Sequence, residues 1–216
     1  MSDPAAMTVD PSCNEHSGST DSSARSDSFQ IVSSVESYGG YVRVWRRSVR
    51  FPDGRTHDWD VAGHARPQPA FVVVFPFFSA SRTTRLLREY AQGVNAIKLT
   101  FPCGGVPGGV SVEQAVMNEL SEEARLRGGR LVRLLPEGHS GISELKWGTN
   151  TFLPFIIIDP EEDQSPRPRD PEEYIADMGE DVPVDELMAL ICKGEVMLPS
   201  VQTAVMALAY INQHNL

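Results

Sequence analysis

Cysteine is scarce in this sequence, whose 216 residues include only Cys13, Cys103 and Cys192. The number is odd and no pair has CxxC spacing, which argues against a disulfide framework and for a reducing compartment. Long apolar runs are also missing, since the longest, from Ala70 to Phe78, contains a proline and is too short to span a bilayer. The first residues lack the basic-then-apolar order of a secretory signal. These absences predict a cytoplasmic protein with no membrane partner.

Basic residues are too few to balance the acidic ones. Lys and Arg together number 19 and Asp and Glu 29, which gives a formal net charge of −10. Such a surface repels phosphate backbones, so we expect no nucleic-acid partner. An acidic protein can still bind an anionic metabolite where metal ions bridge the two.

Large apolar side chains are rare over residues 1–34, which are rich in Ser, Asp, Thr and Pro. Such a segment cannot bury enough surface to offset the entropy of ordering it, so we interpret it as a disordered tail. Apolar patterning begins at position 35, and the hydrophobic fraction of 41% is enough for one domain with a core. The predicted domain therefore spans residues 35–216.

Turns and apolar runs divide this domain into short elements. Alternating segments from Tyr41 to Phe51 and from Arg55 to Gly63 flank the turn sequence Pro52-Asp53-Gly54, which predicts a β-hairpin. Further strands are expected at residues 70–78, 83–90, 131–135 and 151–159, and helices at 112–126, 183–192 and 200–212. This order lacks regular βαβ alternation, which favours an α+β layer fold with a mixed sheet over a doubly wound parallel sheet.

Glycine is concentrated before the first predicted helix, where residues 101–126 read FPCGGVPGGVSVEQAVMNELSEEARL. Ser111 is the expected N-cap, with Gln114 at capping-box spacing, and the helix should end at Gly128-Gly129. The loop has no following Lys-Ser/Thr and no GxGxxG order, so it is not a Walker loop or a dinucleotide fingerprint. Free backbone amides thus precede a helix with clustered carboxylates.

Three of these carboxylates belong to Glu119, Glu122 and Glu123. At roughly 100° per residue, Glu119 and Glu123 share one narrow arc and Glu122 flanks it. Like charges at this spacing repel, and burial would raise their pKa values unless a cation lay between them. Mg²⁺ or Mn²⁺ suits such an all-oxygen site. Two glutamates on a helix are more often a solvated face, but the preceding glycine-rich loop favours a metal site.

This segment resembles the Nudix box, G-x5-E-x7-R-E-U-x-E-E-x-G-U, with U apolar. The matching positions are Gly104, Glu119, Leu120, Glu122, Glu123 and Leu126. The first Glu, the Arg and the last Gly of the pattern are replaced by Val110, Asn118 and Arg125. The resemblance implies a Nudix-type α/β/α sandwich, Mg²⁺ or Mn²⁺ as cofactor, and Glu119, Glu122 and Glu123 as metal ligands.

The likeness extends over about residues 40–214 and points to the ADP-ribose and nucleoside-diphosphate-sugar pyrophosphatases. Four stretches carry it outside the helix of the box: Leu87-Arg88-Glu89-Tyr90 with the following residues 101–104, then residues 139–144, residues 170–175, and residues 194–196. That subfamily cleaves a nucleoside diphosphate linked to a sugar into a nucleoside monophosphate and a sugar phosphate. The resemblance also implies that such proteins form homodimers.

Site roles follow from the same resemblance. The catalytic residues that it implies are Glu122, with Glu172 and Glu173 from the late acidic loop. The substrate contacts expected with it are Gly104, Gly105 and Glu144, and Arg88, with Arg85 as the alternative, is expected to compensate for the arginine that the subfamily has in place of Ala91.

Two further departures bear on turnover. Ala91 stands where the subfamily has Arg, and Thr100 where it has Glu. Two interpretations stay open: a metal-dependent hydrolase, and a Nudix-fold protein that has lost turnover and binds a nucleotide ligand or partner. A purely structural module has only the acidic surface in its favour. The intact trio of glutamates favours the hydrolase.

Overall fold

The computed structural model describes residues 28–65, 70–171, 173–177 and 181–216. Most of the expected tail lies outside these ranges. Its boundary at residue 34 is wrong, however, because strand β1 (Gln30–Gly39) begins earlier. Every residue of β1 is exposed and the strand is held by backbone pairing with β2 (Arg43–Arg50), so no buried face gave its sequence a regular alternation.

The main sheet is mixed, as expected. Its strands run in the order β10 (Arg130–Arg133), β12 (Thr151–Ile158), β4 (Phe71–Phe78), β5 (Thr83–Arg85), β15 (Asp181–Pro183). β4 and β12 are parallel, with Val74 opposite Phe155, and the other pairs are antiparallel. Two further short strands pair with strands of this sheet: β8 (Cys103–Gly105) pairs with β4, and β11 (Ile142–Ser143) pairs with β12.

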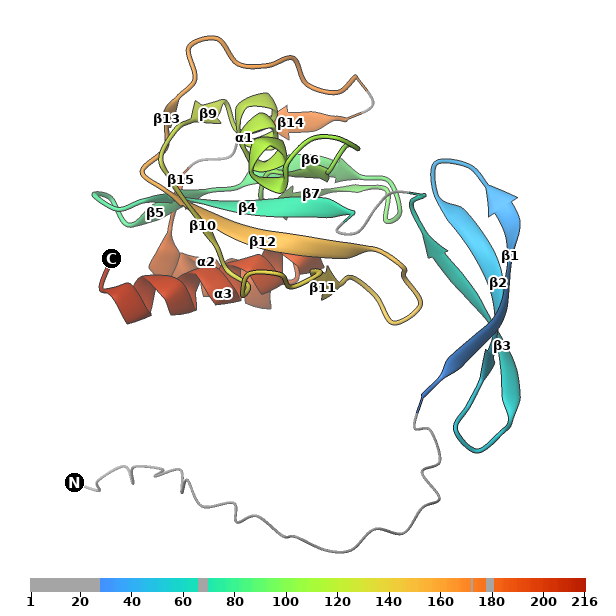
Figure 1. Cartoon of the computed structure of the whole chain (residues 1–216). Helices are drawn as coiled ribbons and strands as arrows, with labels where there is room; N and C mark the ends of the chain where they lie inside the picture. Colours follow the sequence, from blue (N-terminus) through green and yellow to red (C-terminus); the bar gives the residue numbers. More distant parts are fainter. Residues whose placement is uncertain (1–27, 66–69, 172, 178–180) are drawn as a thin grey trace, which may run out of the picture.

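Helices cover both faces of this sheet (Figure 1). Val73, Phe75 and Phe77 of β4 pack on the side of α2 (Val184–Cys192) and α3 (Leu198–His214). Val72 and Val74 pack on the opposite side, with α1 (Val112–Glu122). A strand buried on both faces is apolar throughout, which explains the continuous run in the sequence. The predicted α/β/α sandwich is confirmed.

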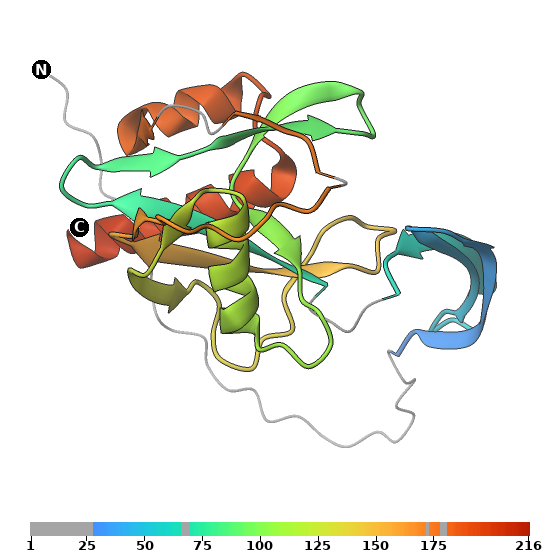
Figure 2. The same ribbon diagram turned by 90° about the horizontal axis from the view of Figure 1, so that it is seen from above.

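The strand expected at residues 83–90 is broken into two. Leu86 packs in the core on the α2–α3 side, whereas Leu87 packs on the α1 side. The chain therefore leaves the main sheet after β5 and forms β6 (Leu87–Ala91) in a second sheet, between β14 (Ile175–Asp177) and β7 (Ala96–Thr100). This second sheet lies beside α1 in Figure 2 and supplies one wall of the site below.

The amino-terminal hairpin is confirmed as β2 and β3 (Thr56–Gly63), and Gly54 takes φ +88° in its turn. With β1 it forms a three-stranded sheet that extends away from the sandwich (Figure 1). Its end meets the body where the Thr149 amide donates to the Ala62 carbonyl at 2.8 Å.

The end of α1 differs from the prediction. The helix stops at Glu122 instead of Leu126, and Arg125 adopts φ +57°. The chain then turns into β9 (Leu126–Arg127), which pairs with β13 (Glu161–Glu162). A left-handed residue ends a helix, and Arg125 occupies the position where the Nudix pattern has its last Gly. Within the described part of the chain, no helix has the length and apolar character needed to cross a bilayer.

Candidate active site

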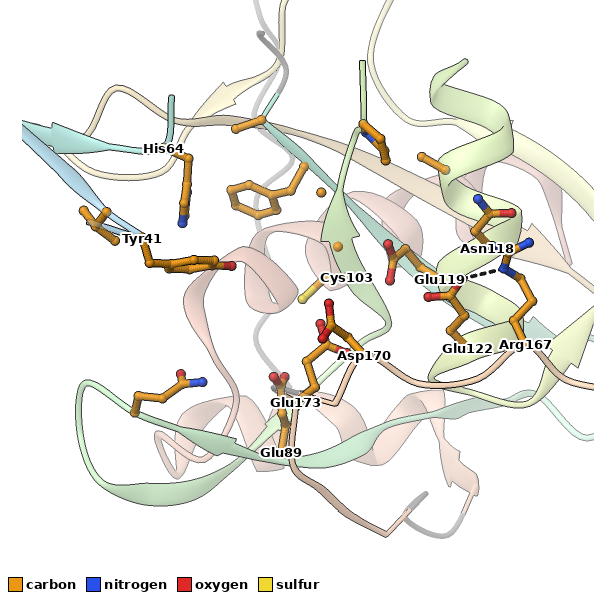
Figure 3. Close-up of a pocket in the computed structure, with 18 residues that line it drawn as sticks. Tyr41, His64, Glu89, Cys103, Asn118, Glu119, Glu122, Arg167, Asp170 and Glu173 are labelled. Carbon is orange, nitrogen blue, oxygen red and sulfur yellow. Dashed lines mark hydrogen bonds and ion pairs between the residues drawn. The ribbon is translucent and has the colours of Figure 1, made fainter. Parts of the chain in front are cut away.

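A cavity of about 750 Å³ opens between α1, β8, β6 and the loop that precedes β14. Its lining is strongly acidic, and the carboxylates concerned are Glu89, Glu119, Glu122, Asp170 and Glu173. They converge from three segments that are distant in sequence (Figure 3). The fold therefore gathers negative charge where the glycine-rich segment meets the helix.

Glu119 lies against the backbone of β8. A Cβ atom added at Gly104 would lie 2.1 Å from its carboxyl group, so a larger residue there would displace that group. Burial raises the pKa of Glu119 to about 8, and the charges of Glu122, Glu173 and Asp170 add to the effect. This carboxyl group is held in a place that favours its neutral form unless a cation is supplied.

Glu123 lies deeper, with only 1% of its surface exposed. The Cys103 amide donates to its Oε2 at 2.7 Å, while no group in the described ranges bonds to its buried Oε1. Burial, together with the charges of Glu119 and Glu173, raises the pKa of Glu123 well above its ordinary value. Such an unpartnered oxygen costs free energy in the absence of a ligand.

Glu122 faces the other side of the cavity, where it forms an ion pair with Arg167 (Figure 3). The loop that carries Arg167 is fastened to α1. Ser121 Oγ accepts a hydrogen bond from the Arg167 amide at 3.0 Å and donates one to Asp163 Oδ2 at 2.7 Å. The helix thus positions the loop as well as its own carboxylates.

Glu173 and Glu89 form the wall opposite α1. Burial raises the pKa of Glu173 to about 7, with contributions from the charges of Glu89, Asp170 and Glu122. Burial also raises the pKa of Glu89. A carboxyl group with a pKa near 7 is suited to exchange protons at neutral pH.

Comparison with known proteins gives the family. The family model described as NUDIX domain matches residues 67–200, more than half of the chain. The chain belongs to the NUDIX family. Among solved structures, one described as "Crystal structure of ADP compounds hydrolase" matches with a TM-score of 0.63 at 18% identity, covering 86% of this chain and 95% of that one. The same fold is therefore present in both. No curated protein sequence matches.

The NUDIX box helix is where the sequence predicted it. Ser111 is the N-cap, since its Oγ accepts from the Gln114 amide at 3.2 Å, although the Gln114 side chain bonds to Asn118 and does not complete a capping box. Glu119 and Glu122 line the cavity, as do Gly104 and Gly105. Glu123 is buried behind them.

Two residues predicted to bind substrate lie outside the cavity lining. Arg88 pairs with Asp177 at 3.0 Å on the surface, because neighbouring side chains of a strand point to opposite faces and Glu89 takes the inner one. Glu144 accepts a hydrogen bond from Asn150 at 3.1 Å, and the same amide group approaches His64 Nδ1 at 3.1 Å. Glu144 thus bonds to Asn150, and Asn150 bonds to His64, which does line the cavity. Glu172 lies outside the described residues.

Several lining residues were not predicted from the sequence. Asp170 and Glu89 fall within stretches that carried the family resemblance, but nothing in their spacing marked them. His64 lacks metal-ligand spacing in the sequence, yet it packs edge-on against Tyr41, with ring centroids 4.9 Å apart, at the end of the cavity away from Arg167 (Figure 3). This end offers aromatic surface, in contrast to the acidic end.

The donor chemistry fits a hard divalent ion. In the ranges that the structure describes, no three Asp, Glu, His or Cys side chains are already gathered at ligand geometry. The carboxylates are nevertheless close enough to raise one another's pKa, and Glu123 keeps a buried oxygen without a partner. Oxygen donors of this kind suit Mg²⁺ or Mn²⁺. The residues that would hold such an ion are Glu119, Glu122 and Glu123.

Proposed function

We propose that this NUDIX protein hydrolyses the diphosphate of a nucleoside diphosphate linked to a sugar or another group, yielding a nucleoside monophosphate and a sugar phosphate. The observation that carries the proposal is the convergence of Glu119 and Glu173, both with raised pKa values, on one cavity whose floor is the Gly104–Gly105 backbone. The neighbouring structure described as an ADP compounds hydrolase supports the same substrate class, of which ADP-ribose is one member.

The residues divide the work between them. Glu119, Glu122 and Glu123 would hold Mg²⁺ or Mn²⁺. When bound, such an ion neutralises diphosphate oxygens and lowers the pKa of a bound water. Glu173 is the proposed base, because its carboxyl group lines the cavity together with Glu119 and Glu122, and carboxylates are common proton acceptors in catalysis. Glu172, its neighbour in sequence, stays a predicted alternative for this role. Gly104 and Gly105 stay predicted contacts for the diphosphate, and the missing side chain at Gly104 makes room for the Glu119 carboxyl group.

The decisive assay uses purified protein, Mg²⁺ or Mn²⁺, and a panel of nucleoside-diphosphate compounds, with chromatographic detection of released monophosphate. Glu123→Gln should abolish metal-dependent hydrolysis. The fold should persist, because Gln keeps the shape of the side chain and an oxygen for the Cys103 amide. Glu113→Gln, with the same charge change on the exposed first turn of α1, is the matched control and should keep full activity. Unchanged turnover in Glu123→Gln would contradict the proposed site.

A ligand-binding protein without turnover is the second candidate. It is favoured by the ion pair between Arg167 and Glu122 and by Asn118, which lines the cavity where the family pattern has Arg. Such a protein would be stabilised against heat by a nucleoside diphosphate and Mg²⁺, with no product released.

Other predictions about the whole protein stay as predictions. A homodimer is one of them, and exposed apolar side chains on β1, namely Ile31, Val35 and Tyr38, offer it a surface. A cytoplasmic location, and the lack of nucleic-acid and membrane partners, are proposed from composition alone.

A further inference from the structure

The acidic cavity has a shortage of positive charge. Arg167 is the single Lys or Arg side chain among the described residues that line it. The arginines of β5 and β6 are engaged elsewhere: Arg88 pairs with Asp177, and Arg85 pairs with Asp181 and Glu162. A diphosphate carries several negative charges, so its recognition here depends on cations that the chain or bound metal provides.

Arg167 combines a fixed backbone with a half-exposed side chain. Its amide donates to Ser121 Oγ at 3.0 Å, and its carbonyl accepts from Arg125 Nη1 at 2.6 Å. Both contacts tie the residue to the carboxyl end of α1. Its side chain, in contrast, is 55% exposed and holds Glu122, whose side chain is 21% exposed, at the mouth of the cavity. A half-exposed ion pair of this kind contributes little stability and exchanges partners easily.

We propose that Arg167 is the diphosphate-binding arginine of this protein, and that it exchanges the Glu122 carboxylate for phosphate oxygens when a ligand enters. The planar guanidinium offers two parallel N–H donors to either partner, so the exchange preserves its hydrogen bonds. It also frees Glu122 to face the cation that accompanies the diphosphate. In the cavity without ligand, the ion pair therefore balances the charges of Arg167 and Glu122 against each other. On ligand binding the two side chains separate. This inference rests on the proposed function, because it takes a nucleoside diphosphate as the ligand.

The exchange gives Arg167→Ala two effects of opposite sign. Glu122 loses a competing cation, so Mn²⁺ alone should bind as tightly as in the wild type or more tightly. The diphosphate loses its arginine and the hydrogen bonds between the two charged groups. The analogue α,β-methylene-ADP, whose bridging carbon resists hydrolysis, should therefore bind at least tenfold more weakly in saturating Mg²⁺. A merely structural role would weaken both.

Both affinities can be measured by isothermal titration calorimetry. Arg167→Lys keeps the charge without the fork and should fall between wild type and Arg167→Ala in α,β-methylene-ADP affinity. Arg127→Ala is the charge-matched control, because its side chain is exposed, pairs with Glu161 at 4.0 Å and is not part of the cavity lining. This variant should bind both probes as the wild type does.

The outcomes separate the inference from the proposed function. If the wild type hydrolyses nucleoside-diphosphate compounds and Arg167→Ala binds α,β-methylene-ADP unchanged, the assignment of Arg167 is overturned and the function stands. A parallel loss of Mn²⁺ and α,β-methylene-ADP affinity overturns it as well. If the wild type binds α,β-methylene-ADP without turnover, the ratio of its affinity to that of Arg167→Ala still tests the role of Arg167. A tenfold or larger ratio supports that role, and a ratio near one overturns it. If the wild type neither binds nor hydrolyses, both proposals fail.

Discussion

At Gly104 the backbone of β8 passes in contact with the carboxyl group of Glu119. Gly104→Ala would place a methyl group 2.1 Å from that carboxyl group, which must then move. A displacement of about 1 Å at a catalytic group can lower turnover roughly 100-fold. We therefore expect kcat to fall by about that factor while the protein still folds.

Gly108→Ala is the matched control for this substitution. It changes a glycine of the same loop, and its added Cβ would meet no atom within 4 Å. Steady-state kinetics of the two variants, with circular dichroism to verify folding, make the comparison. Equal rates in both would show that the position of Glu119 does not matter for turnover.

Single residues of the site differ in how far the sequence could reveal them. Glu119 and Glu122 lie on α1 and Glu123 is its C-cap, next to the glycine-rich loop, so their spacing in the sequence was enough to group them. Whether Arg88 or Glu89 points into the cavity depends on which face of β6 turns inward. The sequence of a short strand does not determine which face that is. Arg167 meets Glu122 across 45 positions of sequence, and only the course of the intervening loop decides that contact.

At the scale of elements, the end of α1 can be tested by comparing the stabilities of two variants of Arg125. A helix that ends at Glu122 and one that continues to Leu126 predict opposite orders. In the structure, Arg125 is left-handed after the helix has ended. Both Arg125→Gly and Arg125→Ala lose the guanidinium contact with the Arg167 carbonyl, but only alanine keeps a Cβ in that conformation. Arg125→Gly should therefore be more stable than Arg125→Ala by about 1 kcal/mol.

A helix that continued to Leu126, as the sequence suggested, requires the reverse order. Glycine inside a helix is less favourable than alanine by roughly 1 kcal/mol. Urea unfolding of the two variants measures the difference directly, and neither variant changes a residue that lines the cavity. If Arg125→Ala is the more stable variant, the result would support a helix that continues to Leu126.

Elements were predictable where packing imposes a pattern. β4 and β12 are buried on both faces, so they appear in the sequence as apolar runs. The start of α1 is predicted by its N-cap residue, Ser111. β1 and β8 depend on backbone pairing with a neighbour, so their own side chains carry no alternation that marks them. The break between β5 and β6 arises because Leu86 and Leu87 enter cores on opposite sides of the sheet. The position of such a break depends on tertiary packing and cannot be predicted from the local sequence.

For the whole molecule, the cluster of raised pKa values makes stability depend on pH in the absence of metal. The pKa of Glu119 rises from 4.5 to about 8, and that of Glu173 to about 7. Between pH 4.5 and about 8 the folded protein holds protons that the unfolded chain has released. Because the native state binds more protons in this window, the free energy of unfolding falls as the pH rises.

The measurement is the urea midpoint of protein treated with EDTA, taken from pH 5.5 to 8.5. We expect the midpoint to fall across this range, and Glu119→Gln to flatten the fall because glutamine cannot ionise. Mg²⁺ should oppose it, since the metal binds the deprotonated carboxylates and its stabilising effect therefore increases with pH. A midpoint that rises between pH 5.5 and 8.5 without metal would mean that these carboxyl groups are ionised at little cost. The cavity would then lack the electrostatic strain that makes a divalent cation its natural complement.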